Sequence, residues 1–314
     1  MLEIFHVTTP FFALILCGYL AANFRLLPEN AVPALNTFVL YFALPCMLVR
    51  FTSQTPFAEL ANLRVFLAYG LASLAMLGLF VGVARIAARE PMRDAAYGGL
   101  AASWSNWGYM GFALLPPMLG PASLPILVAA GMADLLVLVS VAIALASLEG
   151  AQGSVRAALA GAARGIARSP LVWSIAAGGA LSALELPLPQ APAQLLKLLG
   201  DAAVPVALFT IGVSLYRPGT RGGRTEVLVI TGAKLIAHPY LAALVAAYLF
   251  HLPPLEVRTL ALAAALPVAG TVFLLAERAG ANGERIAAAI LVSTALAFFS
   301  FAGLCWAFGV SPAR

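Results

Sequence analysis

Long apolar segments alternate with short polar ones along almost the whole chain. Ten of them come close to or exceed the roughly 20 residues that a helix needs to cross a bilayer core of about 30 Å. They are Thr8–Phe24, Ala31–Thr52, Leu63–Ala88, Ala95–Leu119, Ala122–Leu148, Pro170–Pro187, Pro192–Tyr216, Thr225–Phe250, Val257–Gly280 and Arg285–Gly309. The apolar runs are continuous and lack the period-two alternation of a barrel wall, which favours helices. The pattern therefore predicts an all-α membrane protein with ten transmembrane helices.

Composition excludes a soluble protein. Of the 314 residues, 62% are hydrophobic and only 10% are charged, whereas about a quarter of a soluble domain is charged. The first segment is expected to be a permanent span and not a signal peptide, because it is preceded by Glu3 and His6 where a signal peptide carries basic residues. Cys17, Cys46 and Cys305 lie in predicted spans without metal-ligand spacing, so we interpret them as small buried hydrophobes and expect no metal site.

The basic residues indicate the orientation of the chain in the membrane. With ten spans, the loops on the side opposite the termini hold Arg25, Arg85, Arg89, Arg93, Arg156, Arg164, Arg168, Arg217, Arg221, Arg224, Arg278 and Arg285. The side of the termini holds only Arg50, Arg64, Lys197, Arg258 and Arg314. By the positive-inside rule, both termini are expected on the non-cytoplasmic side of a bacterial inner (cytoplasmic) membrane. Because the net charge of +5 is explained by these loops, we expect no nucleic-acid partner.

The ten spans divide into two groups of five. The stretch 150–169 is rich in Gly, Ala and Arg and is interpreted as a cytoplasmic linker between a first repeat, 1–149, and a second repeat, 170–314. A shift of 160 residues aligns Pro10 with Pro170, Gly18 with Gly178, Pro45 with Pro205, Arg64 with Arg224 and Gly120 with Gly280. Because chance produces about two of the four Pro and Gly coincidences, the matching pattern of spans is needed as further support. Five is odd, so the second group enters the membrane in the opposite orientation, as in many secondary transporters.

The fourth and ninth spans are predicted to be interrupted. The fourth contains SNWGYMGFALLPPMLG (Ser105–Gly120), and the ninth reads LALAAALPVAGTVFLLAERAG (Leu260–Gly280), with Pro267 and Gly270 near its middle. Proline removes a backbone donor and glycine lowers the cost of leaving helical geometry. Paired interruptions of this kind mark a substrate site at mid-membrane. The alternative is that Gly108, Gly111 and Gly270 only allow close helix packing.

Two ionisable residues lie well inside predicted spans, Asp134 in the fifth and Lys234 in the eighth. Buried charges in membranes are costly and are candidates for function. Lys234 either compensates the substrate charge, gains and loses a proton, or has a structural role as a fixed counter-charge or as a donor that bonds to backbone carbonyls. Asp134 either pairs with Lys234, binds a cation, or makes a structural hydrogen bond. A lone His238 on an apolar span is interpreted as a structural residue.

Asn106 is the leading candidate for substrate binding. Its amide has two donors and one acceptor, and beside the start of a half-helix it is suited to hold a carboxylate together with backbone N–H groups; alternatively it only caps the broken helix. Ser103, Ser105, Thr271 and the backbone of Pro267, Val268 and Gly270 complete the expected cluster. Pro45 and Pro205 are interpreted as kinks that shape the cavity, either by packing alone or, for Pro45, with direct substrate contact.

Three stretches resemble the auxin efflux carrier family. They are NWGYMGFALL (Asn106–Leu115), LNTFVLYFALPCMLVR (Leu35–Arg50) and KLIAHP (Lys234–Pro239), in the order in which the family has them. Ala113 departs from the family, which often has proline there. The resemblance implies two inverted five-helix repeats whose fourth and ninth spans cross at the substrate site. It also implies a scaffold of spans 1, 2, 6 and 7, often a homodimer interface, and a moving transport domain of spans 3–5 and 8–10.

The function implied is a secondary active transporter of a small organic anion, with a malonate-like carboxylate as first choice and an auxin-like one as second. A sodium-coupled, bile-acid-like symporter is the close alternative, and a membrane sensor or channel is the alternative of another class. The chain has no Gly-x-Ser-x-Gly elbow and no P-loop, so no enzyme and no cofactor are expected. Coupling to protons, to sodium or to neither stays open. The expected partners are the anion, membrane lipid and a second copy of the chain.

Overall fold

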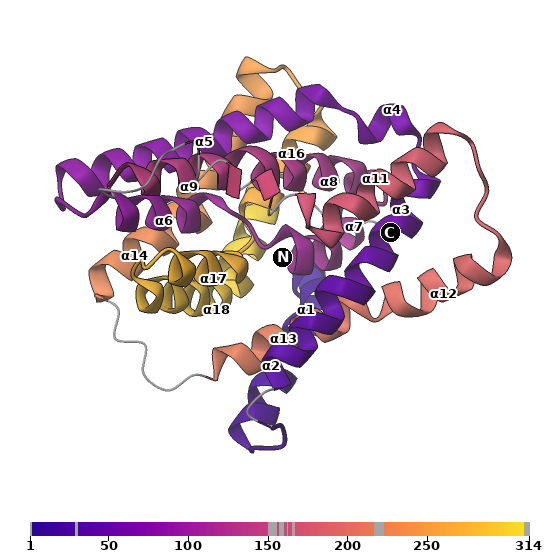
Figure 1. The fold of residues 1–314 in the computed structure, drawn as a ribbon, viewed down its shortest axis with the longest axis horizontal. Helices are drawn as coiled ribbons and strands as arrows, with labels where there is room; N and C mark the ends of the chain where they lie inside the picture. Colours follow the sequence, from indigo (N-terminus) through magenta and orange to yellow (C-terminus); the bar gives the residue numbers. More distant parts are fainter. Residues whose placement is uncertain are drawn as a thin grey trace.

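The computed structural model describes residues 2–28, 31–149, 167–216 and 223–310, with a few residues between 156 and 164. All regular elements in these ranges are helical (Figure 1). Among the described residues, six helical runs are long and apolar enough to cross a membrane: Ala31–Gln54, Phe57–Ile86, Ser123–Ala146, Gln190–Leu215, Thr225–Leu249 and Gly283–Ala307. Thr9–Asn23 and Pro170–Ala183 are shorter apolar helices. The chain is therefore a multi-pass, all-helical membrane protein, as predicted.

The elements follow the predicted spans in order. The first half consists of α1 (Leu2–Asn23), α2 (Ala31–Phe38), the π-helix η1 (Val39–Ala43), α3 (Leu44–Gln54), α4 (Phe57–Leu60), α5 (Leu63–Ile86), α6 (Met92–Ser103), the π-helix η2 (Trp107–Gly111), α7 (Phe112–Leu119), α8 (Ser123–Ala133), the π-helix η3 (Asp134–Leu138), α9 (Val139–Ala146) and the 3-10 helix η4 (Ser147–Glu149). The second half consists of α11 (Pro170–Ala183), α12 (Gln190–Asp201), α13 (Ala203–Leu215), α14 (Arg224–Gly232), the π-helix η5 (Ala233–Ala237), α15 (His238–Leu244), the π-helix η6 (Val245–Leu249), α16 (Pro254–Ala264), α17 (Thr271–Arg278) and α18 (Gly283–Ala307). Most of the predicted linker 150–169 lies outside the described residues.

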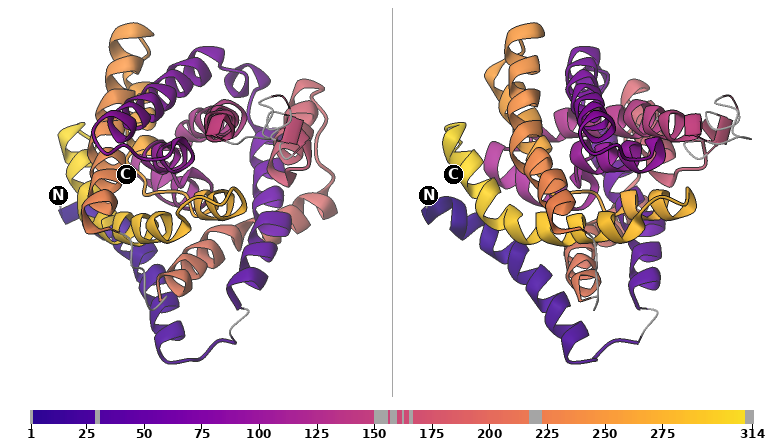
Figure 2. Two further views of the ribbon diagram at one scale, coloured as in Figure 1. Left: turned by 60° about the vertical axis from the view of Figure 1, so that its left-hand side comes forward. Right: turned by 90° about the vertical axis from the view of Figure 1, so that its left-hand side faces the viewer.

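Two groups of helices are visible in space. In Figures 1 and 2, α1 lies beside α13, and α3 lies beside α11 and α12. The other group contains α5, which packs on α6, α8 and α15, together with α14 and α18, which pack on each other. An ion-pair cluster fastens α12 to α3, because Asp201 binds Arg50 at 2.8 Å and Lys197 at 2.7 Å.

Glycines set the closest helix contacts of the first group. A side chain at Gly18 of α1 would collide with the carbonyl of Phe209 and crowd the amide of Val213 in α13. The same contact recurs 160 residues further along: a side chain at Gly178 of α11 would collide with the Thr52 hydroxyl and the Val49 carbonyl in α3, next to the amide of Ser53. The two helix pairs therefore pack in the same register.

The turns after corresponding helices also share their geometry. Left-handed backbone occurs at Arg25 (φ 55°) after α1 and at Glu185 (φ 53°) after α11. It occurs again at Gly120 (φ 83°) after α7 and at Gly280 (φ 69°) after α17. Both pairs are 160 residues apart. The first is unexpected from sequence, because neither arginine nor glutamate favours this region as glycine does.

Pro45 and Pro205 each follow a departure from regular α-helix. η1 precedes Pro45, and the α12–α13 junction at Ala202 precedes Pro205. A proline near the start of a helical segment needs no amide donor, so both fit at these junctions.

The cysteine interpretation is partly wrong. Cys305 is buried, but Cys46 is half-buried and Cys17 is exposed. Cys17 lies on the outer face of α1, and for a helix in a membrane an outward apolar face meets lipid, so a hydrophobic side chain there does not need burial in protein.

Candidate functional site

The two interrupted passages meet through their backbones. α6 ends at Ser103 and α16 ends at Ala264, and the segments that follow form an antiparallel bridge between Ser105 and Val268. The backbone N–H of Asn106 donates to the Pro267 carbonyl at 2.9 Å, and the backbone N–H of Ala269 donates to the Trp104 carbonyl at 3.2 Å. Each broken helix thus satisfies part of the backbone of the other. We call this bridge the crossing.

The crossing leaves donors free at the start of α17. Within the described part of the chain, the amides of Gly270 and Thr271 have no hydrogen-bond acceptor, and no side chain caps the helix. The partial positive charge of a helix N-terminus attracts anions. On the other side of the crossing, the Asn106 carbonyl accepts from the amides of Met110 and Gly111 and starts η2.

Two cavities border the crossing. Cavity A, about 170 Å³, is lined by Val32, Asn36, Leu40, Asn106, Tyr109, Thr210, Ile211, Ser214, Leu215, Gly270, Thr271, Phe273, Leu274, Ala287, Ile290, Leu291 and Thr294. Cavity B, about 330 Å³, is lined by Leu40, Tyr41, Leu44, Trp104, Ser105, Asn106, Trp107, Gly108, Tyr109, Leu135, Ser169, Pro170, Leu171, Ala269, Gly270, Thr271 and Arg278. Asn106, Tyr109, Gly270 and Thr271 line both, so the predicted centre of the site borders real cavities.

The Asn106 side chain is suited to bind a ligand. Asn106 is only 5% exposed, and its side-chain amide, unlike its backbone N–H, makes no hydrogen bond to any described residue. Thr294 of α18 is 2% exposed, lines cavity A and likewise has a hydroxyl without a partner there. Unpaired buried polar groups are costly, and a ligand in the cavity that accepts or donates hydrogen bonds would satisfy both.

Other predicted residues lie beside the cavities without lining them. The Ser103 hydroxyl donates back to the Gly99 carbonyl at 2.7 Å, Gly111 packs against Leu127, and Pro45 lines neither cavity. Pro267 and Val268 contribute backbone to the crossing, and the Val268 amide donates to the Ser293 hydroxyl at 3.2 Å.

Sequence reasoning missed several polar residues of cavity A, namely Asn36, Tyr109, Thr210, Ser214 and Thr294. Each is a neutral polar residue in an otherwise apolar span. A search for uncharged polar residues as well as ionisable ones would have identified them, but not the cavity that they share.

A buried polar cluster lies directly behind the crossing. The Lys234 ammonium donates to the Ser105 hydroxyl at 2.8 Å and to the Ala264 carbonyl at 2.5 Å, and lies 3.1 Å from Nδ1 of His238. The Tyr69 hydroxyl lies 3.0 Å from that of Ser105. Ser73 Oγ lies 3.2 Å from Nε2 of His238. Lys234, His238 and Ser73 are fully buried.

Helical spacing explains how this cluster forms. Tyr69 and Ser73 lie four residues apart on α5, and Lys234 and His238 lie four residues apart on the passage packed against it, so each pair shares a helix face. Ser105 connects the cluster to cavity B, because its hydroxyl accepts a hydrogen bond from Lys234 and the residue also lines that cavity.

Asp134 is the least satisfied residue of the site. It is fully buried, and neither carboxylate oxygen has a hydrogen-bond partner with good geometry among the described residues, although the Ser73 hydroxyl and the Ser105 backbone amide are close enough to stabilise its charge. Lys234 is near enough to interact with it electrostatically, without a hydrogen bond between them. Asp134 starts η3 and Lys234 lies in η5, and π-helical turns of this kind are frequent at functional sites. Within the described residues, no group of three or more His, Cys, Asp or Glu side chains could hold a metal ion.

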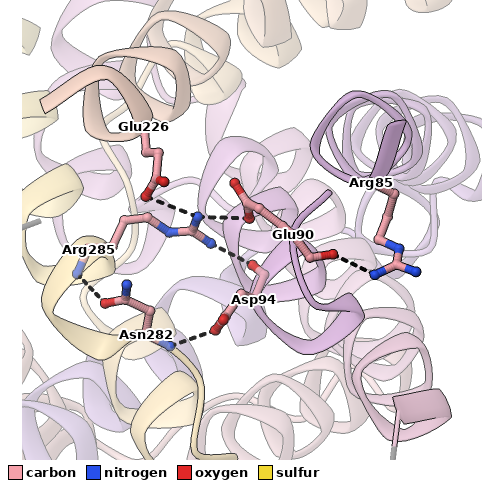
Figure 3. Close-up of polar contacts among 6 residues, drawn as sticks. All are labelled: Arg85, Glu90, Asp94, Glu226, Asn282 and Arg285. Atoms are coloured by element: carbon pink, nitrogen blue, oxygen red, sulfur yellow. Dashed lines mark hydrogen bonds and ion pairs between the residues drawn. The ribbon is translucent and has the colours of Figure 1, made fainter. Parts of the chain in front are cut away.

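A second charged cluster joins the ends of several helices (Figure 3). Arg285 at the start of α18 is 3% exposed and binds Glu90 at 2.8 Å, Glu226 at 3.4 Å and the Asp94 carbonyl at 2.7 Å. The Asn282 amide donates to the Asp94 carboxylate at 2.8 Å. Arg285 was expected to be only one of the basic loop residues, but it joins α6, α14 and α18 at one end of their bundle.

The sequence is similar over nearly its whole length to known membrane transport proteins. Residues 4–305 match the profile of a family described as "Membrane transport protein". A "Putative malonate transporter" of Rhizobium meliloti (strain 1021) is 32% identical over 98% of this chain and 96% of its own length. An "Uncharacterized transporter YfdV" of Escherichia coli (strain K12) is 28% identical over 86% of both chains.

Proposed function

Because this chain belongs to the auxin efflux carrier family of membrane transport proteins, and so is a transporter and not an enzyme, we propose that it is a secondary carrier of a small carboxylate. The favoured substrate is a malonate-like anion, since a relative with full-length similarity carries the name "Putative malonate transporter".

The observation that carries the proposal is the chemistry at the crossing. The unpaired Asn106 amide and the free amides of Gly270 and Thr271 face cavities whose described lining contains no carboxylate. Several N–H donors, a helix N-terminus and an absence of negative charge are suited to a carboxylate. Thr271 and Thr294 add hydroxyl groups.

The proposed architecture is a pair of inverted five-helix repeats, 1–149 and 170–314. The matched glycine contacts of Gly18 and Gly178 support it, as do the matched turns at Arg25 and Glu185 and at Gly120 and Gly280. An internal repeat with an odd number of spans has the inverted topology of many secondary transporters.

The proposed motion is alternating access of the elevator type. The scaffold consists of α1–α3 and α11–α13, and the transport domain of the other transmembrane elements. Cavity A lies between Leu40 and Thr210 of the scaffold and the crossing of the transport domain, and cavity B lies between Leu40 and Leu171 of the scaffold and the same crossing. A third cavity, C, about 610 Å³, lies near the other end of α3 and is lined by Met47, Arg50, Phe51, Gln54, Thr55, Pro56, Glu59, Phe112, Pro116, Pro121, Ala122, Leu124 and Pro125. Cavities at both ends of one domain boundary are suited to a carrier that opens one side at a time.

With the termini outside, cavity B faces the arginine-rich cytoplasmic side, and a reporter fused to the C-terminus tests that orientation.

A homodimer through the scaffold is also proposed, and the mass of the detergent-solubilised protein tests it.

Coupling is proposed to involve Lys234 and Asp134. Their buried charges interact behind the crossing, and Ser105 connects Lys234 to cavity B. Transport into liposomes, measured with and without imposed proton and sodium gradients, distinguishes proton coupling, sodium coupling and uncoupled exchange. Saturable counterflow distinguishes a carrier from a channel.

Asn106→Ala tests the site itself. Hydrogen bonds to a charged group contribute about 1.5–3 kcal/mol, so the variant should raise the half-saturating malonate concentration about tenfold or more. Gln194→Ala, an exposed amide on α12, is the matched control and should behave as wild type. Unchanged affinity in folded Asn106→Ala would remove this residue from the site.

A further inference from the structure

One charged side chain lines the cavities beside the crossing. Among the described residues, Arg278 is the only ionised group that borders cavity A or cavity B. It shares cavity B with Asn106, Gly108 and Thr271. Arg278 is exposed and makes no hydrogen bond or ion pair with any described residue. Its guanidinium is therefore available to a ligand.

The geometry of α17 relates Arg278 to the free amides. Thr271 and Arg278 are the first and last residues of this helix. Seven residues correspond to nearly two turns, so both lie on the same face, with their Cα atoms about 10 Å apart. Helical side chains lean toward the N-terminus, so the arginine stem can bring its guanidinium back toward the crossing.

The reach of this side chain fits a short dicarboxylate. If the Arg278 side chain folds back along α17 by roughly 6 Å, about 4 Å separates its guanidinium from the first turn of the helix. If the side chain is extended away, that separation exceeds about 10 Å. A three- or four-carbon dicarboxylate with a hydrogen bond of about 2.9 Å at each end spans about 9–11 Å. This length lies inside the accessible range.

The surrounding charge favours the same ligand. The Arg93 guanidinium lies beside Gly280, two residues after Arg278. The aliphatic part of the Glu277 side chain packs against Gly283. No carboxylate lines cavity B among the described residues. Arg278 is therefore the only charged side chain in the described lining of cavity B.

We propose that Arg278 binds the second carboxylate of a short dicarboxylate whose first carboxylate lies at Asn106 and the start of α17. Arg278 then determines the preference for dicarboxylates over monocarboxylates. This inference rests on the proposed carboxylate transport. The planar guanidinium binds a carboxylate through two parallel N–H donors, which lysine cannot reproduce.

The test compares malonate with its monomethyl ester as transported substrates. Purified protein in liposomes is used as wild type, Arg278→Gln, Arg278→Lys and Arg25→Gln. Arg25 is an exposed arginine of the same set of loops and lines neither cavity, so its variant controls for loss of surface charge. Because Arg278 is exposed to solvent, its ion pair with the ligand is screened, and Arg278→Gln should raise the half-saturating malonate concentration about fivefold. It should change that of the monoester less than twofold, with Arg278→Lys between the two.

Each outcome decides one proposal. Equal effects on both substrates, or no effect in Arg278→Gln, would overturn the role of Arg278 while carboxylate transport stands. A wild-type protein that moves neither substrate would overturn the proposed function, and with it this inference. If Arg278→Gln unfolds at a lower temperature than wild type, Arg278→Lys decides instead. A larger rise in the half-saturating concentration of malonate than in that of the monoester supports the proposal, and equal rises overturn it.

Discussion

At the scale of single residues, Lys234 replaces backbone donors that the interruption of α16 removes. The last carbonyls of a helix have no partner within it, and Lys234 donates to the carbonyl of Ala264, the final residue of α16. The same ammonium donates to Ser105, which belongs to the other broken passage. One buried side chain thus contacts both sides of the crossing.

Lys234→Met should therefore lower stability as well as abolish transport. Removing the Lys234 side chain leaves the buried Ala264 carbonyl without its donor and takes away the nearby charge that acts on Asp134, and each buried polar group left unsatisfied costs about 1–3 kcal/mol. The midpoint of thermal unfolding in detergent should fall clearly, and adding Asp134→Asn should recover much of it without recovering transport. Transport by Lys234→Met at the wild-type rate and with the wild-type pH dependence would exclude a role for this residue in the cycle.

At the scale of helices, glycines at the contacts allow the short distances between α1 and α13 and between α11 and α3, because glycine has no side chain. A Cβ atom at Gly178 would lie 1.9 Å from the Thr52 hydroxyl oxygen and 2.7 Å from the Val49 carbonyl oxygen. The carbonyl is part of a helix backbone and cannot rotate away, so the helices would have to separate.

Gly178→Ala should destabilise the protein by about 1–3 kcal/mol because of this overpacking. Gly303→Ala on α18 is the matched control, since nothing lies within 4 Å of a Cβ there, and alanine should leave the unfolding temperature unchanged or slightly raised. Thermal unfolding of both variants in the same detergent measures the difference. Equal midpoints would contradict the contact and remove one support for the repeat.

At the scale of the whole molecule, the arrangement separates a group of helices that carries the crossing from one that borders it. Arg285 joins α6, α14 and α18 in the group that carries the crossing (Figure 3), and Asp201 joins α12 to α3 in the other group. Between the groups lie cavities A, B and C. Charged fastenings within each group and cavities between them favour relative motion of two rigid bodies.

A crosslink across cavity C should stop transport. Gln54→Cys on α3 and Ala122→Cys before α8 place two accessible thiols on the lining of cavity C. Both are introduced into a variant in which Cys17, Cys46 and Cys305 are replaced, and a short bifunctional thiol reagent then joins the two new thiols. The matched control is Gly70→Cys with Ala133→Cys, whose Cβ atoms would lie 3.4 Å apart within one group, close to disulfide geometry. Rapid transport by the first crosslinked pair would rule out elevator-type motion at this boundary.

Hydropathy and backbone chemistry made much of this protein predictable from its sequence. The spans and the interruptions of the fourth and ninth passages near Asn106 and Pro267 follow from local properties, namely runs of apolar side chains and the missing donor of proline. So do the buried positions of Asp134 and Lys234, because each lies near the middle of an apolar run.

Only tertiary packing decided which side chains meet. Tyr69, Ser73 and His238 gather around Lys234 because α5 packs against α15, and no local pattern specifies that pairing. Arg285 is buried and Cys17 is exposed, although hydropathy indicates the reverse. The direction in which a polar side chain points depends on the rotation of its helix against neighbours more than 100 residues away, and that rotation is determined by close packing at positions such as Gly18 and Gly178.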